Sequence, residues 1–170
     1  MAEYISFQPS DFFSSKLYTG NSSSAEIPVT GVGFQPDFVW AKNRDATYDH
    51  FLFDSARGAT KYVRSNTTAV EGTNAQTLKS FDSDGYTMGT DSDVNQSTSG
   101  FASWSWKMGT TSGIGGSPST TPEGYSFSAT AGQSIIYYIG TSVAGGGPIA
   151  TLPHGLTKAP EFIIVKNLTA

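Results

Sequence analysis

The sequence predicts an all-β protein, an antiparallel β-sandwich or jelly roll with few or no helices. Three observations lead to this prediction. Among the 170 residues only 14% are charged, 13% are aromatic and 19 are glycines, which suits many short strands and turns rather than a disordered chain. Every long window is interrupted by Gly, Pro or a Ser/Thr cluster, so no amphipathic helix is expected. Short runs of aromatic and β-branched residues recur between turn formers.

Strand-like segments follow one another along the whole chain. Each is rich in Val, Ile, Thr, Tyr, Phe or Trp and is bounded by turn-forming residues. Strands are predicted at Tyr4–Phe7, Phe12–Thr19, Asp37–Lys42, His50–Asp54, Lys61–Arg64, Thr77–Phe81, Gly85–Met88, Phe101–Met108, Tyr125–Ala129, Gln133–Gly140 and Glu161–Lys166.

The alternation of side chains predicts which strand faces are buried. In Phe101–Met108, Trp104 and Trp106 share one apolar face, and we expect this face to lie in the core. In Asp37–Lys42 both faces are apolar, which predicts a central strand covered on both sides, with Trp40 also in the core. The alternative role for the three tryptophans is stacking on sugar rings.

The sequence around residues 31–46 recurs near the end of the chain. When Gly31 is aligned with Gly155, six of the sixteen pairs through Ala46 and Ala170 are identical, where composition alone gives about one. A period of this length is too long for a solenoid or a propeller blade. It predicts whole sandwich units in tandem. The identical pairs are Gly31/Gly155, Pro36/Pro160, Phe38/Phe162, Lys42/Lys166, Asn43/Asn167 and Ala46/Ala170.

The repeat and the local composition predict the domain organisation. Residues 1–11 are expected to form an N-terminal arm, 12–110 a β-sandwich unit, 111–130 a Gly/Ser/Pro linker and 131–170 the opening strands of a second unit. A few isolated strands are marginal in water and expose open edges. We therefore expect these opening strands either to continue beyond Ala170 or to pack on the first unit or on a neighbouring subunit. A longer protein is the preferred alternative.

Charge and cysteine content exclude several functional classes. A net charge of −4 and a pI near 5.0 argue against nucleic-acid binding, which needs clustered Lys and Arg. Because there is no cysteine, disulfides and thiolate metal sites are excluded. No apolar run approaches the length of a membrane span, and the first residues lack a signal-peptide pattern. We expect no nucleic-acid partner and no membrane insertion.

Several motifs in a fixed order resemble a known domain. They are YTGN at 18–21, GVGFQPDFVWAKNRD from 31, HFLFDSARG from 50, LKSFDSDGYTMGTDSDVN from 78 and SGFASWSWKMG from 99. Over about residues 17–108 the chain resembles a repeat domain of virion proteins in tailed bacteriophages, especially marine ones. The opening motifs recur at 137–167. The resemblance implies a concanavalin-like β-sandwich that resides in the virion.

Four aspartates are candidate metal ligands. Asp82 and Asp84 flank one turn, and Asp91 and Asp93 follow closely, so their oxygens are spaced for a Ca²⁺ site. The favoured interpretation is turn chemistry, because Asp84-Gly85 between two strands suits a tight hairpin turn. No EF-hand continuation follows, and no cofactor is expected.

Aromatic residues near turns are the candidate glycan contacts. They are Tyr48, Tyr62 and Tyr86. His50 and His154 have no Ser or Cys motif partner, so we expect structural roles for both. Asp54 and Arg57 are expected to form a local ion pair that orders a loop. No catalytic residue is predicted.

These observations predict a non-enzymatic structural component of a bacteriophage virion, tail-fibre-like or surface-decorating, that acts in assembly and display. Its expected partners are other virion proteins and further copies of itself in a symmetric assembly. The alternative is a carbohydrate-binding module that recognises host-surface glycans. A polysaccharide depolymerase is the third and weakest hypothesis, because no pair of carboxylates is marked in the sequence.

Overall fold

The computed structural model describes residues 8–21, 25–141 and 149–169. The protein is nearly all β, as predicted; the predicted strand Tyr4–Phe7 lies outside the described residues. The helical elements of the described ranges are η1 (Pro9–Asp11) and α1 (Ser92–Asn95). The strands are β1 (Phe13–Thr19), β2 (Ile27–Val29), β3 (Phe38–Asn43), β4 (Phe51–Asp54), β5 (Lys61–Arg64), β6 (Gly72–Thr73), β7 (Leu78–Asp82), β8 (Gly85–Met88), β9 (Gly100–Trp106), β10 (Pro122–Ser128) and β11 (Gln133–Tyr138).

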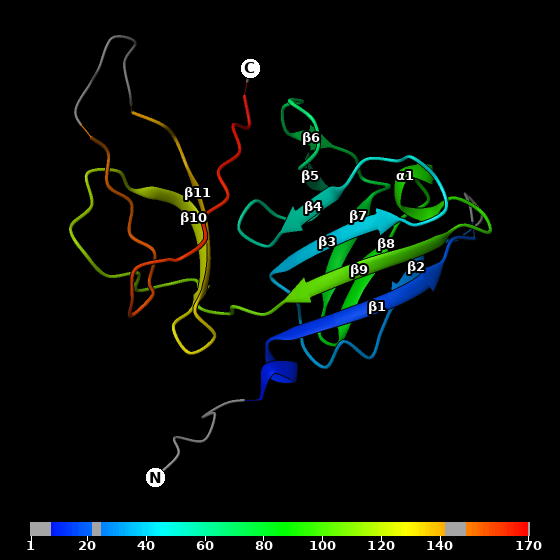
Figure 1. Cartoon of the computed structure of the whole chain (residues 1–170), viewed down its shortest axis with the longest axis horizontal. Coiled ribbons are helices and arrows are strands. Elements are labelled where there is room, and N and C mark those ends of the chain that lie inside the picture. The colour runs from blue at the N-terminus through cyan, green and yellow to red at the C-terminus, as the bar shows by residue number, and fades with distance from the viewer. Residues whose placement is uncertain (1–7, 22–24, 142–148, 170) are drawn as a thin grey trace. The chain divides into compact units, whose positions relative to one another are not determined.

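The first nine strands form two antiparallel sheets. The larger sheet is six-stranded with the order β1-β9-β3-β4-β5-β6, and the smaller is three-stranded with the order β2-β8-β7. Figure 1 shows β1, β9 and β3 side by side in the larger sheet. Because β3 lies between β9 and β4, its predicted central place is confirmed. The predicted cover on both sides is wrong, since its outer residues Phe38, Trp40 and Lys42 are only half-buried.

The core joins these two sheets into a sandwich. One buried cluster includes Val39, Ala41, Phe51 and Phe53 of the larger sheet and Val29, Leu78, Tyr86 and Met88 of the smaller. Burying a large apolar side chain stabilises a fold by about 1.5–3 kcal/mol. The hydroxyl of Tyr86 in β8 also donates a hydrogen bond to the hydroxyl of Ser103 in β9. This bond connects the inner faces of the two sheets.

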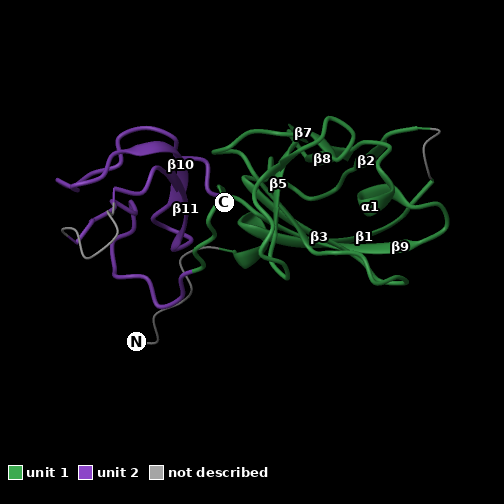
Figure 2. Cartoon of the chain, turned by 90° about the horizontal axis from the view of Figure 1, so that it is seen from above, with its two compact units in different colours: residues 1–107, 164–170 green, residues 108–163 purple. Residues whose placement is uncertain are grey.

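The chain divides into two compact units (Figure 2). Unit 1 contains residues 1–107 and 164–170, and unit 2 contains residues 108–163. Unit 1 holds both sheets of the sandwich. Unit 2 holds the two-stranded antiparallel sheet β10-β11.

The segment 111–130 is not a linker over its whole length, as the sequence analysis predicted. Strand β10 runs through it, with Tyr125 opposite Ile136 and Phe127 opposite Ser134 in β11. The strand forms where aromatic residues, which favour β structure, follow the glycine- and serine-rich stretch, and its backbone pairs with β11. The strand itself was predicted at Tyr125–Ala129, and only the division into domains counted it as linker.

The two copies of the sequence repeat share local backbone geometry. Gly31 and Gly155 both have a positive φ, +72° and +69°, a conformation that glycine adopts most readily. In each copy an Asn side-chain oxygen accepts the backbone N–H two residues further on, at 2.9 Å for Asn43 and 3.1 Å for Asn167. At these points the two copies are therefore similar in structure as well as in sequence.

The predicted strand Glu161–Lys166 is wrong. Its counterpart in the first copy is β3, which is flanked by β9 and β4. Within the part of the chain that the structure describes, residues 161–166 have neither a neighbouring strand nor a strand conformation. A β-strand needs a partner for its backbone N–H and C=O groups, so composition alone does not make one.

The sequence prediction missed four short elements: η1, β2, β6 and α1. Each is too short to show a periodic pattern. The helix α1 begins after Asp91, whose side chain accepts a hydrogen bond from the backbone N–H of Asp93 at 2.8 Å. This is an N-cap, and it turns the buried Val94 towards the core.

The turn between β7 and β8 provides a test of the fold. Gly85 has a φ of +147°, and a Cβ there would lie 1.9 Å from the backbone oxygen of Val29. We predict that Gly85→Ala lowers the free energy of unfolding by about 2–4 kcal/mol. Urea unfolding measures this, with the exposed neighbour Ser83→Ala as control. A Gly85→Ala variant as stable as the control would contradict the described turn.

Candidate functional site

The outer face of the six-stranded sheet carries two rows of aromatic side chains. Across β1, β9 and β3, Phe13 lies opposite Trp106, and Trp106 lies opposite Phe38. In the next row Trp104 lies opposite Trp40. These five residues, Phe13, Phe38, Trp40, Trp104 and Trp106, are called the aromatic face below.

The rings of the aromatic face contact one another. Ring centroids lie 5.2 Å apart for Phe13 and Trp106, 5.1 Å for Phe38 and Trp106, and 6.1 Å for Trp40 and Trp104. The interplanar angles of 57°, 42° and 70° are the tilted and edge-on arrangements that aromatic pairs prefer. Mutual contact thus fixes the orientation of rings that remain partly exposed.

The prediction that the three tryptophans lie in the core is wrong. The buried face of β9 carries its alternate residues Phe101, Ser103 and Ser105. Small serines let the smaller sheet approach, and the hydroxyl of Ser103 receives the hydrogen bond of Tyr86, so the buried polar group is satisfied. The grouping of side chains along β9 was predicted correctly, but the choice of face was reversed.

Polar groups border the rings. The indole N–H of Trp40 donates to Nδ1 of His50 at 2.9 Å, which requires that nitrogen to be unprotonated. In the described part of the chain, the indole nitrogens of Trp104 and Trp106 donate to no protein acceptor and are not enclosed. The face therefore offers two indole N–H groups to solvent.

The three tyrosines predicted as glycan contacts do not form one site. The prediction that Tyr86 contacts a glycan is wrong, because its side chain points inward from β8, is 0% exposed and cannot meet a ligand. Tyr62 packs on Phe51 with ring centroids 4.8 Å apart, and the guanidinium of Arg64 lies 5.2 Å from its centroid. Tyr48 is half-buried in the loop before β4. The position of these tyrosines near turns in the sequence therefore did not predict whether their side chains are accessible.

The first two candidate metal ligands make turn contacts. Asp84 accepts the backbone N–H groups of Gly33 at 2.6 Å and Gly31 at 2.9 Å. These two hydrogen bonds, Gly33 first, lower the pKa of the Asp84 carboxyl. Asp82 accepts the hydroxyl of Thr87 at 2.7 Å. Asp84 thus connects the β7–β8 turn to the loop before β3, and Asp82 bonds across the same hairpin.

The other two aspartates lie around α1. Asp91 caps the helix and also accepts the side-chain N–H of Asn74 at 2.6 Å. Burial, followed by the charge of Asp91, raises the pKa of Asp93, while Arg64 opposes the shift. Over residues 8–21, 25–141 and 149–169, no group of three or more His, Cys, Asp or Glu side chains is placed to hold a metal ion.

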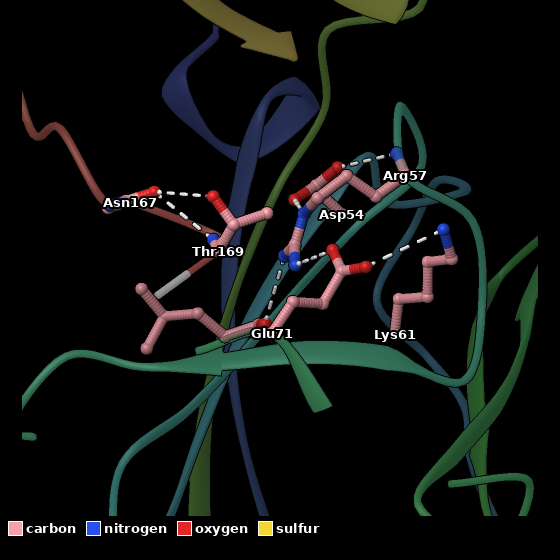
Figure 3. A network of polar contacts seen from close by, with 7 residues as sticks. Asp54, Arg57, Lys61, Glu71, Asn167 and Thr169 are labelled. Carbon is pink, nitrogen blue, oxygen red and sulfur yellow. Dashed lines mark hydrogen bonds and ion pairs between the residues drawn. The ribbon is translucent and has the colours of Figure 1, made fainter. Parts of the chain in front are cut away.

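A buried ion-pair network lies beside β4 (Figure 3). Arg57 donates from Nε to Asp54 at 2.6 Å and from Nη1 to Glu71 at 3.0 Å, with the Arg57 and Asp54 side chains only 6% and 8% exposed. Lys61 lies 3.5 Å from the other oxygen of Glu71. The backbone N–H of Glu71 donates to the carbonyl of Leu168 at 3.0 Å, which anchors the C-terminal segment of unit 1. The predicted loop salt bridge is present, but it is buried.

The comparison with protein families gives one match. A family model described as a domain of unknown function, DUF7483, matches residues 8–170. The chain belongs to the DUF7483 family. The curated proteins and the solved structures gave no match. Among the helices that the structure describes, none has the length and apolar character needed to cross a membrane.

In this DUF7483 chain the aromatic face is the surface best equipped for binding. It stands on paired strands of a rigid sheet, and it combines ring faces with indole N–H donors. The predicted site residues are dispersed, whereas the aromatic face is continuous. The sequence signal that marks it is the alternation in β9, whose two tryptophans share one side.

The Arg57 network gives a prediction for stability. Arg57→Met leaves Asp54 and Glu71 without their main partner, and loss of one member of a buried pair costs about 3–5 kcal/mol. We expect a decrease of this size in the free energy of unfolding, measured in urea. The matched control is Lys61→Met, whose side chain is 41% exposed and whose loss we expect to cost about 0–1 kcal/mol. Equal effects of the two substitutions would contradict the buried network.

His50 gives a prediction for pH dependence. Partial burial and then the charge of Lys42 lower its pKa from 6.5, with Asp49 opposing. Because the folded state disfavours the protonated imidazole, the stability from this group is complete above pH 6.5 and is lost as the pH falls through the folded-state pKa. We expect the NMR signal of the Trp40 indole N–H to titrate with His50. A His50 pKa above 6.5, or a pH-independent Trp40 signal, would contradict this contact.

Proposed function

We propose that this DUF7483 chain is a non-enzymatic structural component of a bacteriophage virion, tail-fibre-like or surface-decorating, that acts in assembly and display. The observation that supports it most is an apolar run near the end of the described chain. Phe162, Ile163, Ile164 and Val165 are 80%, 68%, 58% and 74% exposed. Monomeric proteins rarely leave contiguous apolar residues in water.

The run is suited to contact with another chain. Its backbone makes no strand ladder in the described residues, so its N–H and C=O groups are available to a neighbouring strand. Its near-copy, β3, shows that this type of sequence forms a strand when neighbours flank it. The virion assignment itself follows from the resemblance of the motifs at 17–108 to phage virion repeats.

A second candidate function is recognition of host-surface glycans. The observation that favours it is the aromatic face, with its partly exposed rings and its two free indole donors. A chain of the virion surface can combine both functions, because the apolar run and the aromatic face use different residues. The candidate ligand is derived in the next subsection.

The test of the structural function is the location of the chain. Cryo-EM and mass spectrometry of intact particles from the phage that encodes it should find the chain in a stoichiometric amount and at a symmetric position. We expect Ile164→Ser to reduce its incorporation several-fold, because it places a polar group in the buried contact. Ile149→Ser is the matched control, since Ile149 is 91% exposed outside the run. A chain produced in infected cells yet absent from particles would contradict the proposal.

A further inference from the structure

The aromatic face has the spacing of a surface for an extended ligand. Neighbouring strands of a sheet lie about 4.8 Å apart, and residues two apart along a strand lie about 6.7 Å apart. Trp104 and Trp106 are such a pair on β9, with Trp40 and Phe38 beside them on β3. The rings therefore form a grid in which a flexible chain can meet several of them at once.

The outer surface of these strands is almost uncharged. On β1 the outward positions are Phe13, Ser15, Leu17 and Thr19, and on β9 they include Ala102 and the two tryptophans. On β3, Lys42 is the charged outward residue. Its ammonium donates to the carbonyls of Asn43 at 2.6 Å and Ala46 at 3.2 Å, beyond the end of the rows. In the adjoining strand β4, Asp54 lies opposite Phe38, but its carboxylate is buried and paired with Arg57. An ionic ligand would therefore find no unpaired counter-charge among the rings.

The hydrogen-bonding groups of the face are neutral donors and hydroxyls. The indole N–H groups of Trp104 and Trp106 have no acceptor in the described chain, and Ser15 is exposed next to Trp104 in the row. The partly positive C–H groups of a sugar ring suit the negative face of an aromatic ring, and its hydroxyls suit neutral donors and acceptors. A purely apolar partner would leave both indole N–H groups unpaired on burial, which is costly.

We propose that the aromatic face binds uncharged saccharide chains, with Trp104 and Trp106 as the main contacts. The rings of Trp104 and Trp106 stack on sugar C–H faces, and their indole N–H groups donate to sugar hydroxyls. Phe13, which is 38% exposed on the edge strand β1, extends the platform. Because the rings are spread over three neighbouring strands, affinity depends on how many sugar units contact rings at once, so longer chains bind more tightly.

A protein partner is the competing occupant of this face. Aromatic residues are common in the cores of protein interfaces, so the distinction lies in the two unpaired indole N–H groups, which sugar hydroxyls match and apolar side chains leave unpaired on burial. The experiment below separates the two. The proposal also stands apart from the virion role, since binding of a saccharide by the purified chain does not depend on where the chain resides.

The test is NMR on the full chain with three hexasaccharides as probes. Two are neutral, a β-1,4-linked and an α-1,4-linked glucose hexamer, and the third is a galacturonic acid hexamer. The chain has three tryptophans, so three indole N–H signals report the site separately. We expect a neutral hexamer to shift the signals of Trp104 and Trp106, and the Trp40 signal to move less because it is bonded to His50. We also expect the neutral trimer and the charged hexamer to bind at least tenfold more weakly.

Variants connect the shifts with the proposed contacts. Trp104→Ala should weaken binding at least tenfold, whereas Trp104→Phe, which keeps a ring but loses the N–H, should have an intermediate effect. Phe13→Ala tests the platform at an edge position where truncation does not threaten the core. Tyr48→Ala is the control outside the face, with unchanged affinity expected. Circular dichroism and the remaining indole signals verify that each variant is folded.

Two results would overturn the proposal. One is the absence of any shift of the Trp104 and Trp106 signals at millimolar concentrations of both neutral hexamers. The other is binding that survives Trp104→Ala and Phe13→Ala in folded protein. If saccharides fail to bind while Trp104→Ala blocks incorporation into particles, the occupant is a protein and the virion role stands. If saccharides bind but the chain is absent from particles, the virion role fails and this inference stands.

Discussion

The position of β9 between β1 and β3 is the constraint on which the rest of unit 1 depends. Its inner residues face the smaller sheet, where the hydroxyl of Ser103 meets that of Tyr86. On the same inner face Phe101 stacks on Tyr18 of the neighbouring strand β1 at a centroid distance of 5.0 Å. Because successive side chains of a strand point to opposite faces, this inward set forces the tryptophans outward. The same pairing that closes the core therefore creates the aromatic face.

Much of the fold was predictable from local composition. Lys61–Arg64 and Gly85–Met88 coincide with β5 and β8, and the central place of β3 followed from its two apolar faces. The orientation of β9 was not predictable, because a strand with serines on one side and tryptophans on the other normally buries the tryptophans. Only the partner of Ser103 on another sheet decides the question, and a single sequence does not show that partner.

The repeat illustrates how tertiary context decides secondary structure. Gly31 and Gly155 share a backbone conformation, and Asn43 and Asn167 make the same local hydrogen bond. Between these points the first copy forms β3, whereas residues 161–166 form no strand. The difference lies in the neighbours, since β3 has a strand on each side. The exposed apolar run is thus a strand-forming sequence without a sheet, which is why it supports a role in assembly.

The candidate site depends most directly on the orientation of β9, and thiol labelling measures that orientation. The chain has no cysteine, so a single introduced cysteine is the only thiol that the reagent can label. Ala102 lies on the outer face and is half-buried, whereas its neighbour Ser103 lies on the inner face and is 0% exposed. Our account predicts that a maleimide modifies the folded Ala102→Cys variant rapidly and modifies Ser103→Cys only after unfolding in urea. Rapid labelling of folded Ser103→Cys together with protection of Ala102→Cys would show that the tryptophans face the core.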